Sequence, residues 1–331
     1  MSGTTTDTKG PSGGPRNWEM LLTRQAYADA LVELGHENPK VVVLDADLSQ
    51  STLTRFFAEK FPDRFFDMGI AEQDMVGTAV GLSHMGFIPF FSSYSIFLSG
   101  RAWDQVRNGI SYPLANVKVA AAHGGISVGK DGPTHQSMED CAVMRPIVNF
   151  TIIVPADFHE TFKVTKWAAQ HVGPVFYRMG REKVPTVTTR ETPFVPGQAL
   201  LMQEGSDGTI IANGMMVARA LEAADILAQK GIKSRVLNMH TLKPLDQAAV
   251  LAAARETGAI VTAEEHSRYG GLGSAVAEVI VESEHLVPMR IVGVNDRYLE
   301  SGPPEDLMVL AGLTAERIAL EMETILRKGK R

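Results

Sequence analysis

The sequence is poor in features that would place it in several large classes of protein. Its 331 residues include one cysteine, so no disulfide can form within the chain, and no cysteines and histidines have zinc-site spacing. No apolar run is long enough to span a bilayer. The net charge of -6 offers no general basic surface to nucleic acid. We therefore expect neither a membrane nor a nucleic acid as partner.

The beginning of the chain also lacks an apolar stretch, which a signal peptide would need. Residues 1–16 are rich in Gly, Ser, Thr, Pro and Lys, and this composition predicts a disordered tail. The single thiol lies in the apolar run Cys141–Met144, where cysteine usually packs as a small hydrophobic residue rather than acting as a nucleophile. A reducing compartment fits this usage, so we expect a cytoplasmic protein.

From Trp18 onward, short apolar runs alternate with helical patterns, and this alternation predicts an α/β fold with parallel sheets. The length suggests two domains of roughly 150 residues each. We expect two doubly wound domains, one after the other. In the first, the expected strands are Val41–Leu44, Ile88–Phe91, Val117–Ala122 and Ile152–Val154, and the expected helices are Met20–Leu34, Gln73–His84, Phe97–Ile110 and Phe158–His171.

The alternation breaks after Arg181, where prolines and threonines replace any helical period. We interpret 182–205 as a linker between a first domain, 17–181, and a second, 206–331. In the second domain the alternation resumes. Its expected strands are Thr209–Ala212, Arg235–Met239 and Ile260–Ala263, and its expected helices are Val217–Lys230, one that begins at Ser274, and Ala315–Leu326.

Polar residues follow four strands expected in the first domain, namely three of those above and a short strand around Phe66. In open parallel sheets, ligands bind at the carboxyl ends of strands, so four polar strand ends suggest one shared site. Loops are polar on most surfaces, which would explain any one of them alone. The four segments are Asp45–Ser51, Gly69–Glu72, Ser92–Tyr94 and His123–His135.

Two glycine-rich segments come close to nucleotide-binding motifs. Gly124–Asp131 has the glycine and lysine spacing of a P-loop, but Asp131 stands where the motif needs Ser or Thr. Gly270–Gly273 has part of a dinucleotide fingerprint, whose spacing then fails at Val276. Two histidines and Asp131 within one loop favour proton transfer or the binding of hydroxyl groups.

Several segments together resemble the transketolase family, including deoxyxylulose-phosphate synthase. The resemblance covers nearly the whole chain after the tail, and the Asp-Gly-Pro-Thr-His-Gln string is its most specific part. The segments are Gly69-Ile70-Ala71-Glu72-Gln73-Asp74, Gly129–Gln136, Asp45–Leu48, and Ala263–His266 followed by Gly270–Gly273.

One family signature is missing from this sequence. Full-length transketolases begin with a domain that binds the cofactor's diphosphate through magnesium and carries a Gly-Asp-Gly motif, which is absent here. The resemblance therefore implies a pyrimidine-binding domain followed by a C-terminal domain. It implies thiamine diphosphate and Mg²⁺ held mainly by a partner, the N-terminal diphosphate-binding subunit, and no metal ligand in this chain. It also implies homodimerisation within a heterotetramer.

The resemblance assigns roles to residues around the cofactor. Glu72 matches the catalytic glutamate that hydrogen-bonds a nitrogen of the aminopyrimidine ring; the alternative is a glutamate that merely suits a helix N-terminus. Tyr94 and Phe97 match aromatic residues that pack on that ring, although Gly100 stands where the family often has another aromatic. Asp47 is expected to lie at the same mouth of the site.

The resemblance also assigns substrate residues. His135 matches a catalytic residue that binds hydroxyls of the donor ketose, and Asp131 one that senses their stereochemistry. Arg24, Ser51, His123 and Arg181 match positions that hold a terminal phosphate, and His123 is also a catalytic candidate.

The implied reaction moves a two-carbon ketol unit from a ketose to an aldose, and the ketose is expected to be phosphorylated. The chain would then be a transferase subunit that works only with its partner. Three alternatives stay open: the beta subunit of a 2-oxoacid dehydrogenase, a subunit like deoxyxylulose-phosphate synthase, and a non-catalytic regulatory subunit. The first usually has His-Ser-Gln where this chain has Thr134-His135-Gln136.

Overall fold

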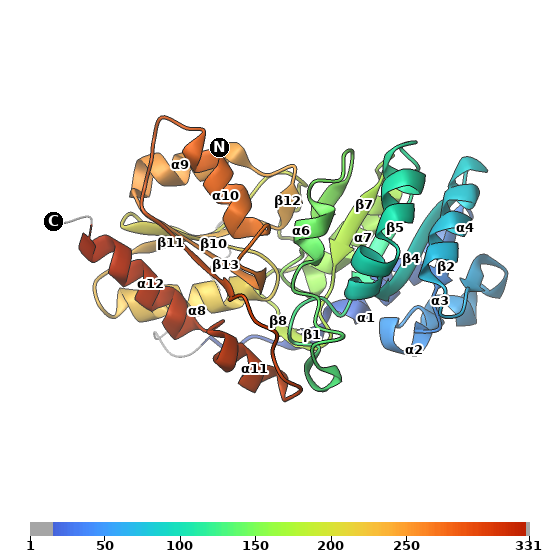
Figure 1. Cartoon of the computed structure of the whole chain (residues 1–331), viewed down its shortest axis with the longest axis horizontal. Coiled ribbons are helices and arrows are strands. Elements are labelled where there is room, and N and C mark those ends of the chain that lie inside the picture. Colours follow the sequence, from blue (N-terminus) through green and yellow to red (C-terminus); the bar gives the residue numbers. More distant parts are fainter. Residues whose placement is uncertain (1–15, 329–331) are drawn as a thin grey trace.

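The computed structural model describes residues 16–328, which form two mostly parallel sheets covered by helices (Figure 1). The first is a seven-stranded sheet with the order β12-β6-β7-β5-β4-β2-β3. Its strands are parallel except β12. They are β2 (Val41–Asp45), β3 (Phe65–Asp67), β4 (Ile88–Tyr94), β5 (Lys118–Ala122), β6 (Thr151–Ile153), β7 (Val175–Arg178) and β12 (Thr241–Lys243).

Helices cover both faces of the first sheet, because consecutive residues of its central strands are buried on opposite sides. In β2, Val41 and Val43 pack in one core cluster, whereas Val42 and Leu44 pack in another. The helices are α1 (Thr23–Glu37), α2 (Ser49–Thr52), α3 (Arg55–Lys60), α4 (Glu72–His84), α5 (Trp103–Gln105), α6 (Asp140–Met144) and α7 (Phe158–Gln170). This is the doubly wound arrangement expected from the apolar runs.

The second sheet has five strands in the order β14-β13-β10-β11-β9, all parallel except β9. Its strands are β9 (Leu200–Gln203), β10 (Gly208–Ala212), β11 (Ser234–Asn238), β13 (Ile260–Ser267) and β14 (Met289–Val294). Its helices are α8 (Met216–Ala228), α9 (Gln247–Thr257), α10 (Leu272–Val281), α11 (Pro304–Ala311) and α12 (Ala315–Lys328).

The two sheets are joined by shared structure. Strand β12 follows β11 of the second sheet in sequence but pairs antiparallel with β6, at the edge of the first sheet. One apolar cluster continues from one sheet to the other, with Phe176 and Leu242 from β7 and β12 of the first sheet and Leu237 from β11 of the second. The two halves therefore bury a common core.

Some elements differ from those expected. The helix expected from Met20 begins at Thr23, because Met20–Leu22 forms β1, which pairs antiparallel with β8 (Lys183–Pro185). The helix expected over Phe97–Ile110 is two π-helical segments, Phe97–Arg101 and Val106–Ser111, on either side of α5. Propensity and periodicity do not distinguish these local hydrogen-bond patterns.

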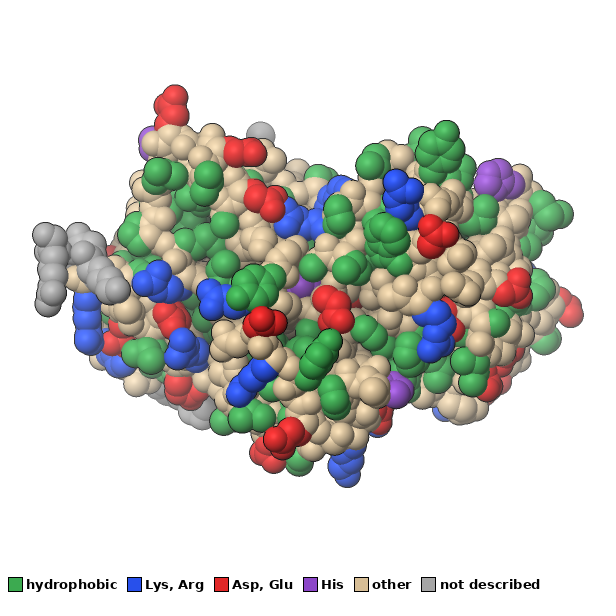
Figure 2. Space-filling model, viewed as in Figure 1, with side chains coloured by type: hydrophobic (Ala, Val, Ile, Leu, Met, Phe, Trp, Pro, Cys, Tyr) green, Lys and Arg blue, Asp and Glu red, His purple; other side chains and the backbone are tan. Residues whose placement is uncertain are grey.

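The segment 182–205 contains β8 and β9, so two short strands lie within the stretch that was expected to be a linker. The expected tail, 1–16, lies outside the described residues except for Arg16, whose Nε lies 2.6 Å from Asp225 Oδ2. No helix within 16–328 combines the length and apolar character needed to cross a membrane. Figure 2 shows acidic and basic side chains interspersed over the face drawn there.

Candidate active site

The candidate site lies at the carboxyl ends of the central strands of the first sheet. Strands β5, β4, β2 and β3 are consecutive neighbours, so the segments that follow them open at the same edge. The structure brings all four expected polar strand ends to this edge. Direct contacts join them: Met68 N donates to Asp45 O, Ser93 lies against Glu72, and Tyr94 stacks on His123.

Glu72 is the first residue of α4, and its side chain is 1% exposed. Ser93 Oγ donates to its Oε1 across 3.3 Å, and Arg101 Nη1 lies 2.8 Å from its Oε2. The helix dipole favours an acidic residue at this end, but a residue that serves only the dipole has no need to be buried. The contacts with Ser93 and Arg101 hold this buried carboxyl group in a fixed position within the site.

Four aromatic rings gather next to this carboxyl group. Tyr94 stacks on Phe97 with centroids 5.8 Å apart and on His123 at 4.0 Å. The His135 ring meets Tyr94 and Phe97 edge-on at 5.9 and 5.5 Å, and its Nδ1 lies 2.9 Å from Thr134 Oγ1. A flat heteroaromatic ring that hydrogen-bonds a carboxyl group fits this combination of surfaces.

His123 follows β5 in a strained conformation, with φ at 57°, in the left-handed region that non-glycine residues rarely adopt. The residue is buried, and its Nδ1 has no hydrogen-bond partner within the described protein. Burial, with the charges of Arg24 and Arg181, lowers the pKa of His123 to about 2. The imidazole is therefore neutral at physiological pH and holds an unused polar atom, which suits hydrogen bonding to a ligand.

Two arginines meet behind this histidine. Arg24 donates from Nη1 to Ser51 O and from Nη2 to Arg181 O across 2.7 Å. Burial, followed by the charge of Arg181, lowers the pKa of Arg24. Arg181 donates to Val128 O across 2.6 Å and pairs with Asp131 Oδ2 at 3.1 Å. Ser51 thus contacts Arg24 through its carbonyl oxygen. The positively charged side chains of Arg24 and Arg181 lie close together on one side of the site, and this pair is called the basic wall below.

The loop after β2 is organised by Asp45, which is fully buried. Its carboxylate accepts hydrogen bonds from Leu48 N at 2.6 Å, Thr52 Oγ1 at 2.7 Å and Thr54 Oγ1 at 2.8 Å. Burial raises the pKa of Asp45 to about 6 although these bonds oppose the rise. Asp47 lies at the exposed outer side of this loop, where its N–H donates to Asp67 Oδ1. Asp47, like Asp131, is thus an expected site residue that the structure leaves exposed at the rim.

The second half of the chain holds the loop 123–136, which carries both histidines. Glu265, from β13, reaches across, and its Oε1 accepts a hydrogen bond from Ser127 N at 2.7 Å. At the other end of the loop, Gln136 Nε2 donates to Glu300 O across 3.1 Å. The second half therefore fixes the position of the loop even though it adds no residue to the aromatic cluster.

A buried ionic cluster around Asp140 holds the segment that carries Tyr94 near the contact between the two halves of the chain. Asp140 Oδ2 lies 2.9 Å from Arg178 Nε and accepts a hydrogen bond from Ser95 Oγ, next to Tyr94, at 2.6 Å. Burial alone would raise the pKa of Asp140, but Arg178 and His266 outweigh it and lower that pKa. The buried charge is thus compensated, as a stable core requires.

Among residues 16–328, three potential metal ligands come within reach of one another at Asp140, Cys141 and His266. Their ligand atoms are already engaged: His266 Nε2 accepts from Ala142 N at 3.2 Å, and Nδ1 lies 2.7 Å from Ser267 O. Burial also raises the pKa of the Cys141 thiol, so the thiolate that a metal needs is disfavoured. This cluster is not a fit for Mg²⁺, which prefers oxygen ligands.

Three residues of the site were not expected from the sequence: Arg101, Glu265 and Asp140. Arg101 lies four positions after Phe97, a spacing at which a helix places a cation over an aromatic ring, so a local signal existed. For Glu265, the signal was the run Glu264-Glu265-His266 inside a buried strand, since buried charges need partners from elsewhere. Nothing local marks Asp140, because its partner Arg178 is distant in sequence.

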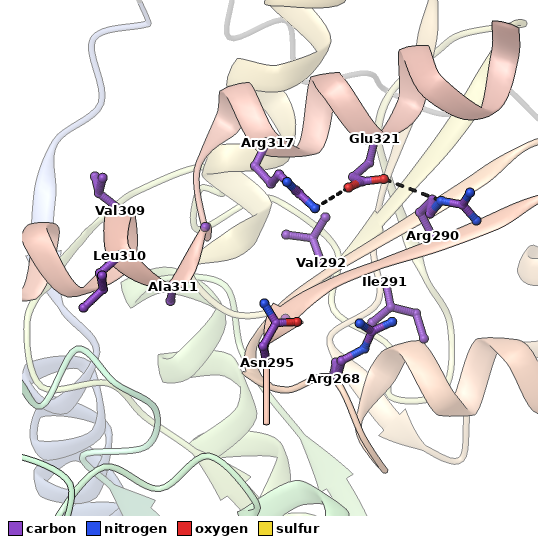
Figure 3. A pocket seen from close by; sticks show the side chains of 12 residues that line it. Arg268, Arg290, Ile291, Val292, Asn295, Val309, Leu310, Ala311, Arg317 and Glu321 are labelled. Atoms are coloured by element: carbon purple, nitrogen blue, oxygen red, sulfur yellow. Dashed lines mark ion pairs between the residues drawn. The ribbon is translucent and has the colours of Figure 1, made fainter. Parts of the chain in front are cut away.

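A second cleft, of about 510 Å³, lies in the other half of the chain, away from all the expected site residues. Figure 3 shows Glu321 of α12 between Arg290 and Arg317, with Arg317 Nη2 at 2.6 Å and Arg290 Nε at 3.6 Å. Glu321 thus neutralises part of the charge of this cleft.

Family models match both halves of the chain. The transketolase pyrimidine-binding domain matches residues 19–186, and the transketolase C-terminal domain matches residues 197–318.

Similar proteins extend over nearly the same length. A transketolase C-terminal section of Methanocaldococcus jannaschii is 43% identical over 92% of this chain and 96% of its own length. A 6-deoxy-6-sulfo-D-fructose transketolase subunit of Clostridium sp. is 43% identical over 89% of this chain and 91% of its own. A solved structure of a split gene transketolase, an inactive beta4 tetramer, is 51% identical with a TM-score of 0.87, and the match covers 93% of this chain and 99% of that one.

Proposed function

The chain belongs to the transketolase family, and from this premise we propose that it is the subunit of a split transketolase that holds the aminopyrimidine ring of thiamine diphosphate. With a diphosphate-binding partner it would move a two-carbon ketol unit from a ketose to an aldose. The extent of the relatives supports this: the match covers 91% of a separate transketolase subunit and 99% of a split gene transketolase chain.

The observation that carries the proposal is Glu72, 1% exposed and fixed beside an aromatic cluster at the strand ends. A carboxyl group in this position can share a proton with a nitrogen of the aminopyrimidine ring, while Phe97, supported by Tyr94 stacked behind it, packs against the ring face. The carbon–carbon bond chemistry is supplied by thiamine diphosphate when it is bound. The role of this chain is to orient the ring and to control that one proton.

The substrate side follows from the same geometry. In this proposal His123, kept neutral by burial, and His135 hydrogen-bond the hydroxyls and carbonyl of a ketose. Arg24 and Arg181 form the basic wall for an anionic group at the far end of the sugar. One similar subunit is named for a sulfonated sugar, so the anion recognised here is either a phosphate or a sulfonate.

The partner would supply the groups that this chain does not bring together. We propose that the N-terminal diphosphate-binding subunit holds Mg²⁺ and the diphosphate, and that two copies of each chain form a cytoplasmic heterotetramer. Closed twofold symmetry is the commonest arrangement of such assemblies. The similar split transketolase forms a tetramer of its own chain that is inactive, in keeping with activity that needs both subunits.

The test is reconstitution. The chain is purified alone and together with a diphosphate-binding transketolase subunit that carries the Gly-Asp-Gly motif, and thiamine diphosphate binding is followed by calorimetry with and without Mg²⁺. We expect weak binding by the chain alone, tight Mg²⁺-dependent binding by the mixture, and ketol transfer from a panel of phosphorylated and sulfonated ketoses only by the mixture. Tight Mg²⁺-dependent binding by the chain alone would contradict the split arrangement.

A further inference from the structure

Arg101, which none of the roles above includes, touches the two groups proposed to hold the cofactor ring. It ends the π-helical segment Phe97–Arg101, and Gln73 Nε2 fixes its backbone by donating to Arg101 O across 3.1 Å. Its guanidinium lies over the Phe97 ring, with Cζ 4.6 Å from the centroid, while Nη1 lies 2.8 Å from Glu72 Oε2. One planar group therefore stacks on Phe97 and donates to Glu72 at the same time.

These are the two contacts proposed for the aminopyrimidine ring. The ring cannot avoid Arg101 by entering between Tyr94 and Phe97. Their centroids are 5.8 Å apart and their planes differ by 13°, whereas an inserted ring needs about 7 Å, two van der Waals contacts of about 3.5 Å. Arg101 and the ring therefore compete for the same carboxyl group and the same aromatic surface.

We infer that Arg101 is an internal stand-in for the aminopyrimidine ring, which pairs with Glu72 until the cofactor ring displaces its guanidinium into solvent. This inference rests on the proposed function. The side chain of Arg101 is 47% exposed, so its flexible stem can swing outward without movement of the backbone. Glu72, at 1% exposed, would otherwise be a buried carboxylate without a counterion, which is strongly destabilising.

The test uses the full chain and a fragment, the free hydroxymethyl derivative of the cofactor's aminopyrimidine. Binding is measured at a pH where the fragment is uncharged, by ligand-detected NMR and by the rise in melting temperature, for the wild type, Arg101→Ala and Arg101→Gln. Arg107→Ala is the matched control, because Arg107 is an exposed arginine in the next π-helical segment whose side chain bonds only to its neighbour Asn108 among the described residues.

If Arg101 competes with the ring, Arg101→Ala binds the fragment about three- to tenfold more tightly, because the free energy of a half-exposed ion pair no longer opposes binding. Added salt, which screens that pair, strengthens binding by the wild type and by Arg107→Ala but not by Arg101→Ala. Arg101→Gln, which keeps a donor but no charge, lies between and decides the question if the alanine variant does not fold.

Two other results would overturn the inference. Weaker binding by Arg101→Ala would show that Arg101 helps to hold the ring, and unchanged binding with a lower melting temperature would show that it only stabilises the fold. In both cases the fragment binds and the proposed function stands. If the fragment binds none of the proteins at millimolar concentration, the proposed ring site is wrong and the inference fails with it.

Discussion

Replacing Glu265 by alanine should loosen the histidine-bearing loop without unfolding the chain. Glu265 Oε1 accepts a hydrogen bond from Ser127 N at 2.7 Å, the one acceptor for this amide within residues 16–328, and both groups are buried. A hydrogen bond to a charged group contributes about 1.5 to 3 kcal/mol, and the alanine variant leaves the amide without that acceptor. Taking about 2 kcal/mol, local opening of the loop becomes roughly 30-fold more frequent.

Amide hydrogen exchange of the peptide 123–136 measures this opening directly. Glu265→Gln should give a smaller increase, because the amide oxygen can still accept from Ser127 while the negative charge near Arg178 is lost. The loop packs closely on this carboxyl group, since a Cβ added at Gly125 would clash with it. Glu284→Ala, at an exposed glutamate in the same half of the chain, serves as the control.

If exchange in 123–136 matches the wild type while the melting temperature of Glu265→Ala falls, Glu265 stabilises the joint between the two halves and does not hold the loop. In the reconstituted enzyme, we expect the loosened loop to raise KM for the ketose, because His123 and His135 lie on it.

Three further predictions concern single side chains. Glu72→Gln should keep the fold but lower ketol transfer by about 10²–10⁴-fold, the range for loss of an acid–base group, and deuterium exchange at the thiazolium carbon should slow in parallel. Arg181→Ala should raise KM for anionic sugars by about ten- to a hundredfold and hardly change it for uncharged sugars, and equal losses would mean a structural role. Burial raises the pKa of Glu160 from 4.5 to about 7. Its stabilisation is therefore fully present below about pH 4.5 and is lost as the pH rises through about 7, a loss of at most about 3 kcal/mol. Denaturant unfolding of Glu160→Gln should lack this decline, and a decline equal to that of the wild type would point to another group.

The parts of the fold that follow from local pattern could be predicted from the sequence. Four-residue apolar runs such as Val41–Leu44 mark strands buried on both faces, and all four strand ends were expected at one site because parallel strands direct their carboxyl ends to one edge. What escaped prediction depends on partners far apart in the chain. Glu265 reaches Ser127 across 138 residues, and β12 pairs with a strand of the other half. No local periodicity reports such pairings.

The crossing of β12 has a consequence for shortening or exchanging the two halves. A chain cut between residues 186 and 197, where the two family matches part, would remove β12 from its own sheet and leave β6 as a bare edge strand. An unpaired edge is a template for association with other chains, and the apolar surface around Phe176 and Leu242 would be opened with it. Hybrids that take each half from a different relative would have to carry β12 with the first half. The unit that can be inherited or transplanted intact is therefore the pair of domains together.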